Sequence, residues 1–224
     1  MKLEELITLY RAQSMDKQHS TGSASDVLCD DELLTIYANE GQDEACRRGQ
    51  LLRDSLSPMC TVQFAAGAEA LALDARVINV LRAHIDGQPV GTLDVDQMDE
   101  DVPGWQYRDA TGLPTHLVSG LTTGMLHIWP RPKQAGTLRL TVQRLPIKSM
   151  KSEADKPEIR PELHAGLVDW MLYRAYSRED TDLHNDSKAA IALGRFEAEF
   201  GRKVSGRNEE WVRQGGSALP GPIA

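Results

Sequence analysis

The most chemically suggestive stretch of the sequence is an acidic run near its C-terminal end. Four side chains there carry the atoms that bind hard cations: Asp180, Asp182, His184 and Asp186. A calcium loop also needs a glycine at its sixth position and an acidic ligand at its twelfth, because the chain turns sharply and the last carboxylate closes the ligand shell. Asn185 and Ile191 occupy those positions. We therefore expect the run to cap a helix, and we expect no metal and no cofactor.

A second acidic cluster lies in the middle of the chain. It consists of Asp94, Asp96, Asp99, Glu100 and Asp101. Paired carboxylates can act as acid and base in glycoside hydrolysis. This cluster falls between turn signals, so the sequence favours a solvated loop.

A nucleophilic triad can be drawn from His116, His127 and Ser119, which fall in or near predicted strands. No motif supports it, because the sequence contains no GxSxG elbow, Walker phosphate loop, GxGxxG fingerprint or HExxH zinc motif. Structural roles are therefore the better interpretation of these three residues. We expect no catalytic residues and no enzymatic activity.

The composition limits the classes of partner. The chain has 224 residues, 41% of them hydrophobic, and a formal net charge of −8, which argues against a whole surface that binds nucleic acid. A local basic patch stays open. The cysteines Cys29, Cys46 and Cys60 are odd in number and have no CxxC spacing, so we expect free thiols in a reducing compartment. We see no signal peptide and no stretch of membrane-spanning length, which predicts a soluble protein made in a cytoplasm.

The clearest element that could position such residues is a helical hairpin in residues 157–204. Apolar side chains recur there at helical spacing on both sides of the acidic run: Leu163, Leu167, Trp170, Met171, Ala175, Tyr176, Ala189, Leu193, Phe196 and Phe200. Pro161 suits a first helical turn and Gly201 suits a helix end. We expect two antiparallel helices with the break at 178–186, and we expect His164 to be a surface or packing residue.

Two further helices are predicted near the N-terminus. Leu3, Leu6, Ile7 and Tyr10 mark a short amphipathic helix, followed by a polar loop at 15–26. A longer helix is expected from Asp30 or Asp31 to about Asp54, with either aspartate as the N-cap. Gly41 and Gly49 lie inside it, where a glycine is tolerated when another backbone packs closely.

The middle of the chain has the sequence pattern of short β-strands. Short runs separated by Gly, Pro and Asp turn signals lie at 62–64, 77–85, 91–95, 115–120, 125–129 and 137–145. In the last run Leu138, Leu140 and Val142 alternate with polar residues, so one face is buried. Antiparallel strands of this kind bury their faces in a sandwich or small barrel.

These elements predict an α+β protein in which a helical bundle carries an inserted, antiparallel, β-sandwich-like module. We place the bundle in residues 1–56 and 157–204, the β-module in 57–147, a charged linker in 148–156 and an extended C-terminal tail in 205–224. The tail is rich in Gly and Pro, so we expect it to be mobile in the isolated subunit and to order on assembly.

The order of elements resembles that of the head-to-tail adaptor (connector) proteins of tailed bacteriophages. The residues that carry the resemblance are DDELLTIYANEGQDEACRRGQLL, a strand-rich middle with Trp105, GLPTHLV, LHIWPRP and GTLRLTVQRLP, and then PEIRPELHAGLVDWMLYRAYSREDTDL and FEAEFG. It covers roughly residues 1 to 204 and is a distributed pattern without an active residue.

The resemblance implies a structural virion protein of the neck. Copies of such proteins form a ring, commonly of twelve, that connects the portal at the capsid vertex to the tail or nozzle protein and continues the DNA channel. It also implies that DNA passes without specific binding, that no membrane is involved, and that the C-terminus reaches the portal. An acidic chain agrees with a channel that does not hold phosphates.

The partner-binding residues that we predict lie in the tail. They are Arg207, Trp211, Val212 and Arg213, a large apolar anchor with neighbours, for the portal or an adjacent subunit. Two other classes stay open. A non-catalytic module binding carbohydrate or protein would expose Trp105, Tyr107 and Trp129, and a small hydrolase would need a pocket with a perturbed acid or base.

Overall fold

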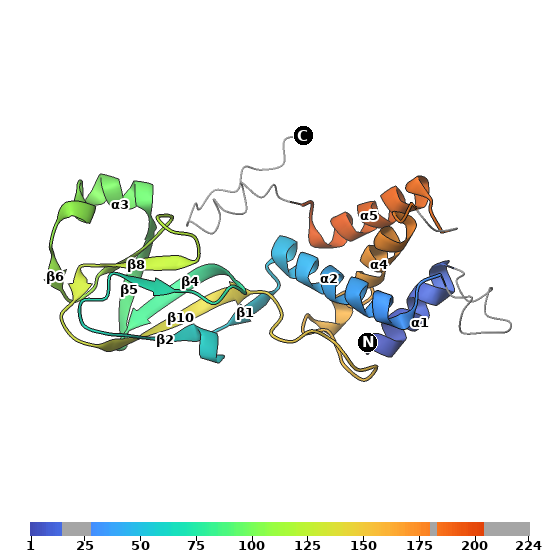
Figure 1. The fold of residues 1–224 in the computed structure, drawn as a ribbon, viewed down its shortest axis with the longest axis horizontal. Helices are drawn as coiled ribbons and strands as arrows, with labels where there is room; N and C mark the ends of the chain where they lie inside the picture. Colours follow the sequence, from blue (N-terminus) through green and yellow to red (C-terminus); the bar gives the residue numbers. More distant parts are fainter. Residues whose placement is uncertain (15–27, 180–182, 204–224) are drawn as a thin grey trace. The chain divides into compact units, whose positions relative to one another are not determined.

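The protein is α+β, as the sequence predicts, and its chain divides into two compact units. The computed structural model describes residues 1–14, 28–179 and 183–203. A helical unit comprises Met1–Leu52 and Leu145–Lys203, and a β unit comprises Arg53–Arg144. Figure 1 shows the four long helices of the helical unit and the sheet of the β unit.

The helical unit contains α1 (Leu3–Ser14), α2 (Asp31–Gly49), a 3₁₀ turn η4 (Pro161–Leu163), α4 (Leu167–Tyr176) and α5 (Asp186–Phe200). Local capping explains two of the starts. The Asp30 carboxylate accepts a hydrogen bond from the Leu33 amide at 2.7 Å, and the Asn185 side chain accepts one from the Lys188 amide at 2.9 Å. The predicted N-cap of α2 is confirmed, and Gly201 follows α5 as expected. The cap of α5 is Asn185 and not one of the four residues Asp180, Asp182, His184 and Asp186, of which Asp186 lies in the first turn of the helix.

The core of this unit forms where the four helices meet. Its fully buried large side chains include Tyr10, Leu34, Leu167, Met171 and Phe196. Trp170 is half-buried and lies against Phe196, with ring centroids 5.0 Å apart. Gly41 allows this packing, because a Cβ there would lie 3.1 Å from the Cβ of Trp170. Gly41 is a packing site as expected, although the close neighbour is a side chain and not a backbone, whereas Gly49 is the last residue of α2 and lies against Leu51.

The expected end of α2 near Asp54 is wrong. The helix ends at Gly49, and Gln50 takes a left-handed conformation with φ of 48°. Residues Leu52–Asp54 then form strand β1. The apolar residues Leu51 and Leu52, which extended the helical pattern in the sequence, pack instead against the helical core from beyond the helix end.

The segment expected to be a linker, 148–156, makes specific contacts with the helices. The Asn39 side chain accepts a hydrogen bond from the Met150 amide at 2.8 Å and donates one to the Met150 carbonyl at 3.0 Å. The Leu3 amide donates to the Asp155 carbonyl at 2.8 Å. Met150 itself is buried in the helical core, so the segment has a fixed place beside α1 and α2.

The β unit is built around one curled, mixed sheet. Its strands are β1, β2 (Thr61–Phe64), β3 (Ala70–Ala72), β4 (Val77–Ile85), β5 (Gln88–Asp94), β7 (His116–Ser119), β8 (Met125–Trp129) and β10 (Gly136–Arg144). They follow the order β1-β10-β4-β5-β7-β8-β3, with β2 also on β10, and a small separate pair joins β6 (Thr111–Gly112) to β9 (Arg131–Pro132). The six predicted runs all contain strands, and Leu138, Leu140 and Val142 are buried as expected.

Two expectations about this unit are wrong. Strand β5 pairs with β7 in parallel, so the sheet is not purely antiparallel. The acidic cluster at 94–101 is solvated as expected, since Asp96, Asp99, Glu100 and Asp101 are exposed, but it is not a loop. Asp94 accepts a hydrogen bond from the Gln97 amide at 2.7 Å and starts helix α3 (Val95–Asp101). The two facts are connected, since parallel strands need a crossover and α3 lies within the one that joins β5 to β7.

The sheet is covered on both faces where β7 and β8 run. Leu117 belongs to the larger core of the unit, whereas its neighbour Val118 packs with Met98 of α3 and with Trp105. Successive side chains of a strand point to opposite faces, which explains this division. The short helix α3 and the 3₁₀ turn η3 (Trp105–Tyr107) thus lie over a second, smaller core.

Candidate functional site

A pocket of about 320 Å³ opens in the β unit beside this smaller core. Its lining comes from strand β8, the turn η3 and the loops around them, and consists of Glu69, Trp105, Gln106, Arg108, Ala110, Leu121, Thr122, His127, Ile128, Trp129 and Arg131. All of these residues belong to one unit. The volume is enough for a side chain and its adjoining peptide group, or for several water molecules at about 30 Å³ each.

The alternation of β8 places two polar aromatic rings in this pocket. Leu126 and Ile128 are buried in the larger core, so His127 and Trp129 lie on the opposite face of the strand. The register pairs His127 with Val118 and with Ala70, which fixes its height along the sheet. The sequence alternation alone therefore determines that both rings share one face.

Both rings present a buried nitrogen that has no hydrogen-bond partner among the described residues. These atoms are His127 Nε2 and Trp129 Nε1. Burial lowers the pKa of His127, and the Glu69 carboxylate only partly opposes that effect, so the imidazole is neutral at pH 7. A neutral imidazole Nε2 can donate or accept, whereas the indole N–H can only donate.

The two arginines of the pocket lining have different partners. Arg131 pairs with Glu69 at 2.8 Å and with Asp109 at 2.9 Å. The guanidinium of Arg108 donates to the Pro103 carbonyl at 2.9 Å. Arg131 is therefore held by two carboxylates, and Arg108 by a main-chain carbonyl.

Of the three aromatic residues that a carbohydrate-binding module would expose, two are packed into the protein. Trp105 is buried, and its indole donates to the Asp99 carboxylate at 2.8 Å. Trp129 packs into the smaller core, with its ring centroid 6.1 Å from that of His116. Tyr107 alone of the three is fully exposed, at 93%. No pair of them forms an exposed stacking platform in the part of the chain that the structure describes.

Two residues of the hypothetical triad, His116 and Ser119, form hydrogen bonds outside it. His116 Nδ1 lies 2.9 Å from the Thr115 hydroxyl, and the Ser119 hydroxyl donates to the Leu93 carbonyl at 3.2 Å. Ser119 thus binds the neighbouring strand β5. These contacts support the structural roles that the sequence favours.

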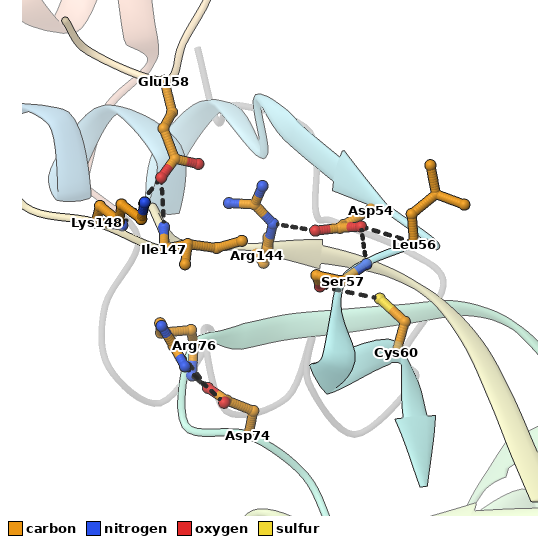
Figure 2. A network of polar contacts seen from close by, with 10 residues as sticks. All are labelled: Asp54, Leu56, Ser57, Cys60, Asp74, Arg76, Arg144, Ile147, Lys148 and Glu158. Atoms are coloured by element: carbon orange, nitrogen blue, oxygen red, sulfur yellow. Dashed lines mark hydrogen bonds and ion pairs between the residues drawn. The ribbon is translucent and has the colours of Figure 1, made fainter.

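A buried polar network lies at the other end of the sheet (Figure 2). The Arg144 guanidinium donates to Asp54 at 2.6 Å, and the amides of Leu56 and Ser57 donate to the same carboxylate at 2.9 and 3.1 Å. Burial by itself raises the pKa of Asp54, but these hydrogen bonds together outweigh it and hold that pKa well below its usual range. The network joins β1 to the end of β10. The periodicity of the sequence does not predict it, because Arg144 falls on the same face of its strand as the apolar residues Leu138, Leu140 and Val142.

Cys60 lies beside this network, with its Sγ 3.6 Å from the Ser57 hydroxyl. Burial raises the pKa of the Cys60 thiol, which keeps it protonated and unreactive. The other two cysteines are also buried, and neither forms a disulfide. The expectation that the three cysteines are thiols and not disulfides is confirmed.

The remaining candidates lie partly outside the described residues. Of the acidic run, Asp180 and Asp182 fall there, as do all four predicted partner-binding residues: Arg207, Trp211, Val212 and Arg213. Within the described ranges, no group of three or more His, Cys, Asp and Glu side chains could hold a metal ion. His164 is a buried packing residue whose Nε2 lies 2.9 Å from the Ile159 carbonyl.

Comparison with known proteins gives one clear relation. A protein-family model described as "SU10 adaptor protein" matches residues 1–219, almost the whole chain. No curated protein matches the sequence. Among the described residues, no helix is long and apolar enough to cross a membrane.

Proposed function

Because this chain belongs to the SU10 adaptor protein family, a family of phage head–tail adaptors, we propose that copies of it form a ring that joins the portal at the capsid vertex to the tail. Membership of the family makes the protein a structural component of the phage virion. The ring, the portal contact and a continuous DNA channel are the specific parts of the proposal. The observation that carries it is the family match over residues 1–219.

Physical features of the chain support this assignment. A ring subunit needs a rigid body with two different lateral surfaces, because head-to-tail contacts between identical copies close into a ring. The four-helix unit and the sheet, which is covered on both faces where β7 and β8 run, are each well packed. The net charge of −8 also suits a channel through which DNA slides without being held by clustered lysines and arginines.

The proposed partners are the portal, a tail or nozzle protein, and eleven further copies of the chain, with DNA passing through. We propose that Arg207, Trp211, Val212 and Arg213 contact the portal or a neighbouring subunit, with Trp211 as the anchor. Tryptophan and arginine are enriched among interface residues whose loss costs about 2 kcal/mol or more.

Electron microscopy of the purified chain mixed with the portal encoded beside it tests the proposal. We expect a twelve-membered ring seated on one end of the portal. A chain that stays monomeric at high concentration and does not co-sediment with the portal contradicts the ring and the portal contact together. Rings that form without binding the portal contradict only the second.

A further inference from the structure

We infer that the exposed part of the β sheet binds a second copy of this chain, through the acidic helix α3 of that copy. The inference rests on the proposed function, since it specifies one contact between neighbouring subunits of the ring. We call the surface on the sheet the basic face. It consists of Arg82 and His84 of β4, Arg139 of β10, and the polar side chains Thr61, Gln63, Thr137 and Thr141.

Strand alternation places the two arginines of the basic face side by side. Ala83 and Leu140 are buried in the larger core of the β unit, so their neighbours Arg82 and Arg139 lie on the opposite face of the sheet. The register pairs Ala83 with Leu140, and His84 with Arg139. Arg82 and Arg139 are therefore diagonal neighbours on adjacent antiparallel strands, about 7–8 Å apart.

The charge of these two arginines is not compensated within the described part of the chain. Both side chains are exposed, and neither forms an ion pair with a residue that the structure describes. Asp86, which follows β4, instead accepts a hydrogen bond from the Thr137 amide at 3.0 Å. Other arginines of the same unit do pair with carboxylates, namely Arg76, Arg131 and Arg144. The basic face therefore favours an anionic partner.

Helix α3 carries an acidic surface of matching spacing. Met98 is buried and Val95 and Val102 pack against the same small core, so Asp96 and Glu100 lie on the exposed side of the helix. The two are one helical turn apart, with their Cβ atoms about 5–6 Å from each other. Neither carboxylate has an ion-pair partner in the described ranges. Each can face one guanidinium of the basic face.

The two surfaces do not meet within one chain. Helix α3 contacts β5 and β7, whereas Arg82 and Arg139 lie on β4 and β10 (Figure 1). No ion pair joins the two surfaces among the described residues. Each copy thus carries one surface of each kind, and pairing them between copies gives a head-to-tail contact, the type that closes into a ring.

Nucleic acid fits the basic face less well than a second copy does. Tight binding of a DNA duplex involves about 6–10 phosphate contacts, mostly from clustered Lys and Arg. Each copy offers here only the guanidiniums of Arg82 and Arg139. Their spacing matches that of the two carboxylates on α3, so the chain itself supplies the complementary surface.

Charge reversal of each surface in the full chain tests the contact. One variant carries Arg82→Glu and Arg139→Glu, and the other carries Asp96→Lys and Glu100→Lys. Sedimentation velocity at about 0.1 M salt, where the Debye length is about 10 Å, measures self-association. We expect each variant alone to associate at least about tenfold more weakly than the parent, because like charges then face each other.

An equimolar mixture of the two variants should recover the parental association. Copies of the two kinds can alternate, so that opposite charges meet at every contact of a ring with an even number of copies. Recovery also shows that both variants are folded. A mixture that stays dissociated would overturn the inference.

Lys133→Glu combined with Lys151→Glu is the matched control. Both lysines are exposed and lie outside the basic face, and the substitutions change the net charge by the same amount as the reversal of the two arginines. The control should associate as the parent does. A control as weak as the variant with the reversed basic face would show an effect of net charge alone and would overturn the inference.

The outcomes separate this contact from the proposed ring. If the parent and both reversed variants form rings equally well, the ring stands and the contact is excluded. Open oligomers that show loss on reversal and recovery on mixing would support the contact and contradict the closed ring. A parent that is monomeric both alone and with the portal contradicts both. Duplex DNA that binds the parent in place of self-association, and does not bind the variant with the reversed basic face, would overturn the inference in favour of nucleic acid.

Discussion

At the scale of single residues, the most consequential contact in the β unit is the ion pair between Asp54 and Arg144. The side chains are only 10% and 12% exposed, and two main-chain amides bind the same carboxylate (Figure 2). Asp74 and Arg76 in the same unit form a pair of similar length, 2.8 Å, but their side chains are 27% and 40% exposed. The two pairs therefore provide a comparison of equal chemistry at different burial.

We predict that Asp54→Ala lowers the free energy of unfolding by about 3 kcal/mol, because it leaves the Arg144 charge buried and frees two amides. Asp74→Ala, at an exposed pair, should cost about 0–1 kcal/mol. Urea unfolding followed by tryptophan fluorescence measures both. Equal losses of unfolding free energy in the two variants would show that burial does not increase the contribution of the ion pair to stability.

The same carboxylate gives the β unit a defined response to acid. The pKa of Asp54 is depressed in the folded state, so its contribution to stability is complete above the unfolded value, near 4, and is lost as the pH falls toward the folded value. The difference in unfolding free energy between the parent and Asp54→Ala should therefore shrink as the pH is lowered from 7 to about 2. Urea unfolding at a series of pH values measures it, and a difference that stays constant contradicts the assignment.

At the scale of elements, the contact of α2 with α4 depends on the absence of a side chain at Gly41. A Cβ there would lie 3.1 Å from two atoms of Trp170. The ring cannot easily withdraw, because Phe196 and Tyr173 lie 5.0 and 5.3 Å from it, centroid to centroid. Arg48 also stacks over it at 5.5 Å.

We predict that Gly41→Ala destabilises the helical unit by about 1 kcal/mol, since overpacking of 1–3 kcal/mol exceeds the gain of about 1 kcal/mol in helix propensity. Gly194 is the control, because it lies within α5 and a Cβ added there would have no other atom within 4 Å. Gly194→Ala should stabilise by about 0.5–1 kcal/mol. The melting temperatures of the two variants should therefore move in opposite directions. If both rise, the Trp170 side chain shifts to make room for the added methyl group.

Elements set by nearby residues were predictable from the sequence. The caps Asp30 and Asn185 each bind an amide three residues away, so the sequence contains both partners. The early end of α2 was missed because the apolar pattern ran on through Leu51 and Leu52, which pack on the helical core from outside the helix. Periodicity reports burial, and it does not distinguish the last turn of a helix from a buried segment just beyond its end.

The parallel pair and the pocket depended on long-range pairing. Asp94 and its neighbours resembled a turn because no local signal tells that β5 must cross over to lie beside β7. The shared face of His127 and Trp129 followed from strand alternation. Their burial without partners depends on η3 covering that face, which the sequence of β8 alone does not contain.

At the scale of the whole molecule, the family match extends beyond the described residues, to position 219, and includes the four residues that we propose as partner-binding. An adaptor needs surfaces for at least two different proteins and for its own copies. We propose that the portal or neighbour contact lies in residues 205–224.

We predict that deletion of residues 205–224 leaves the melting temperature of the subunit unchanged but abolishes co-sedimentation with the portal. A Trp211→Ala variant of the full chain should weaken the same association at least about thirtyfold, which corresponds to the 2 kcal/mol typical of a central interface anchor. Val212→Ala, a smaller truncation beside it, should weaken it less. If the truncated chain melts lower than the parent, Trp211 instead packs on its own subunit. If the truncated chain assembles with parental affinity, the portal contact must lie elsewhere on the molecule.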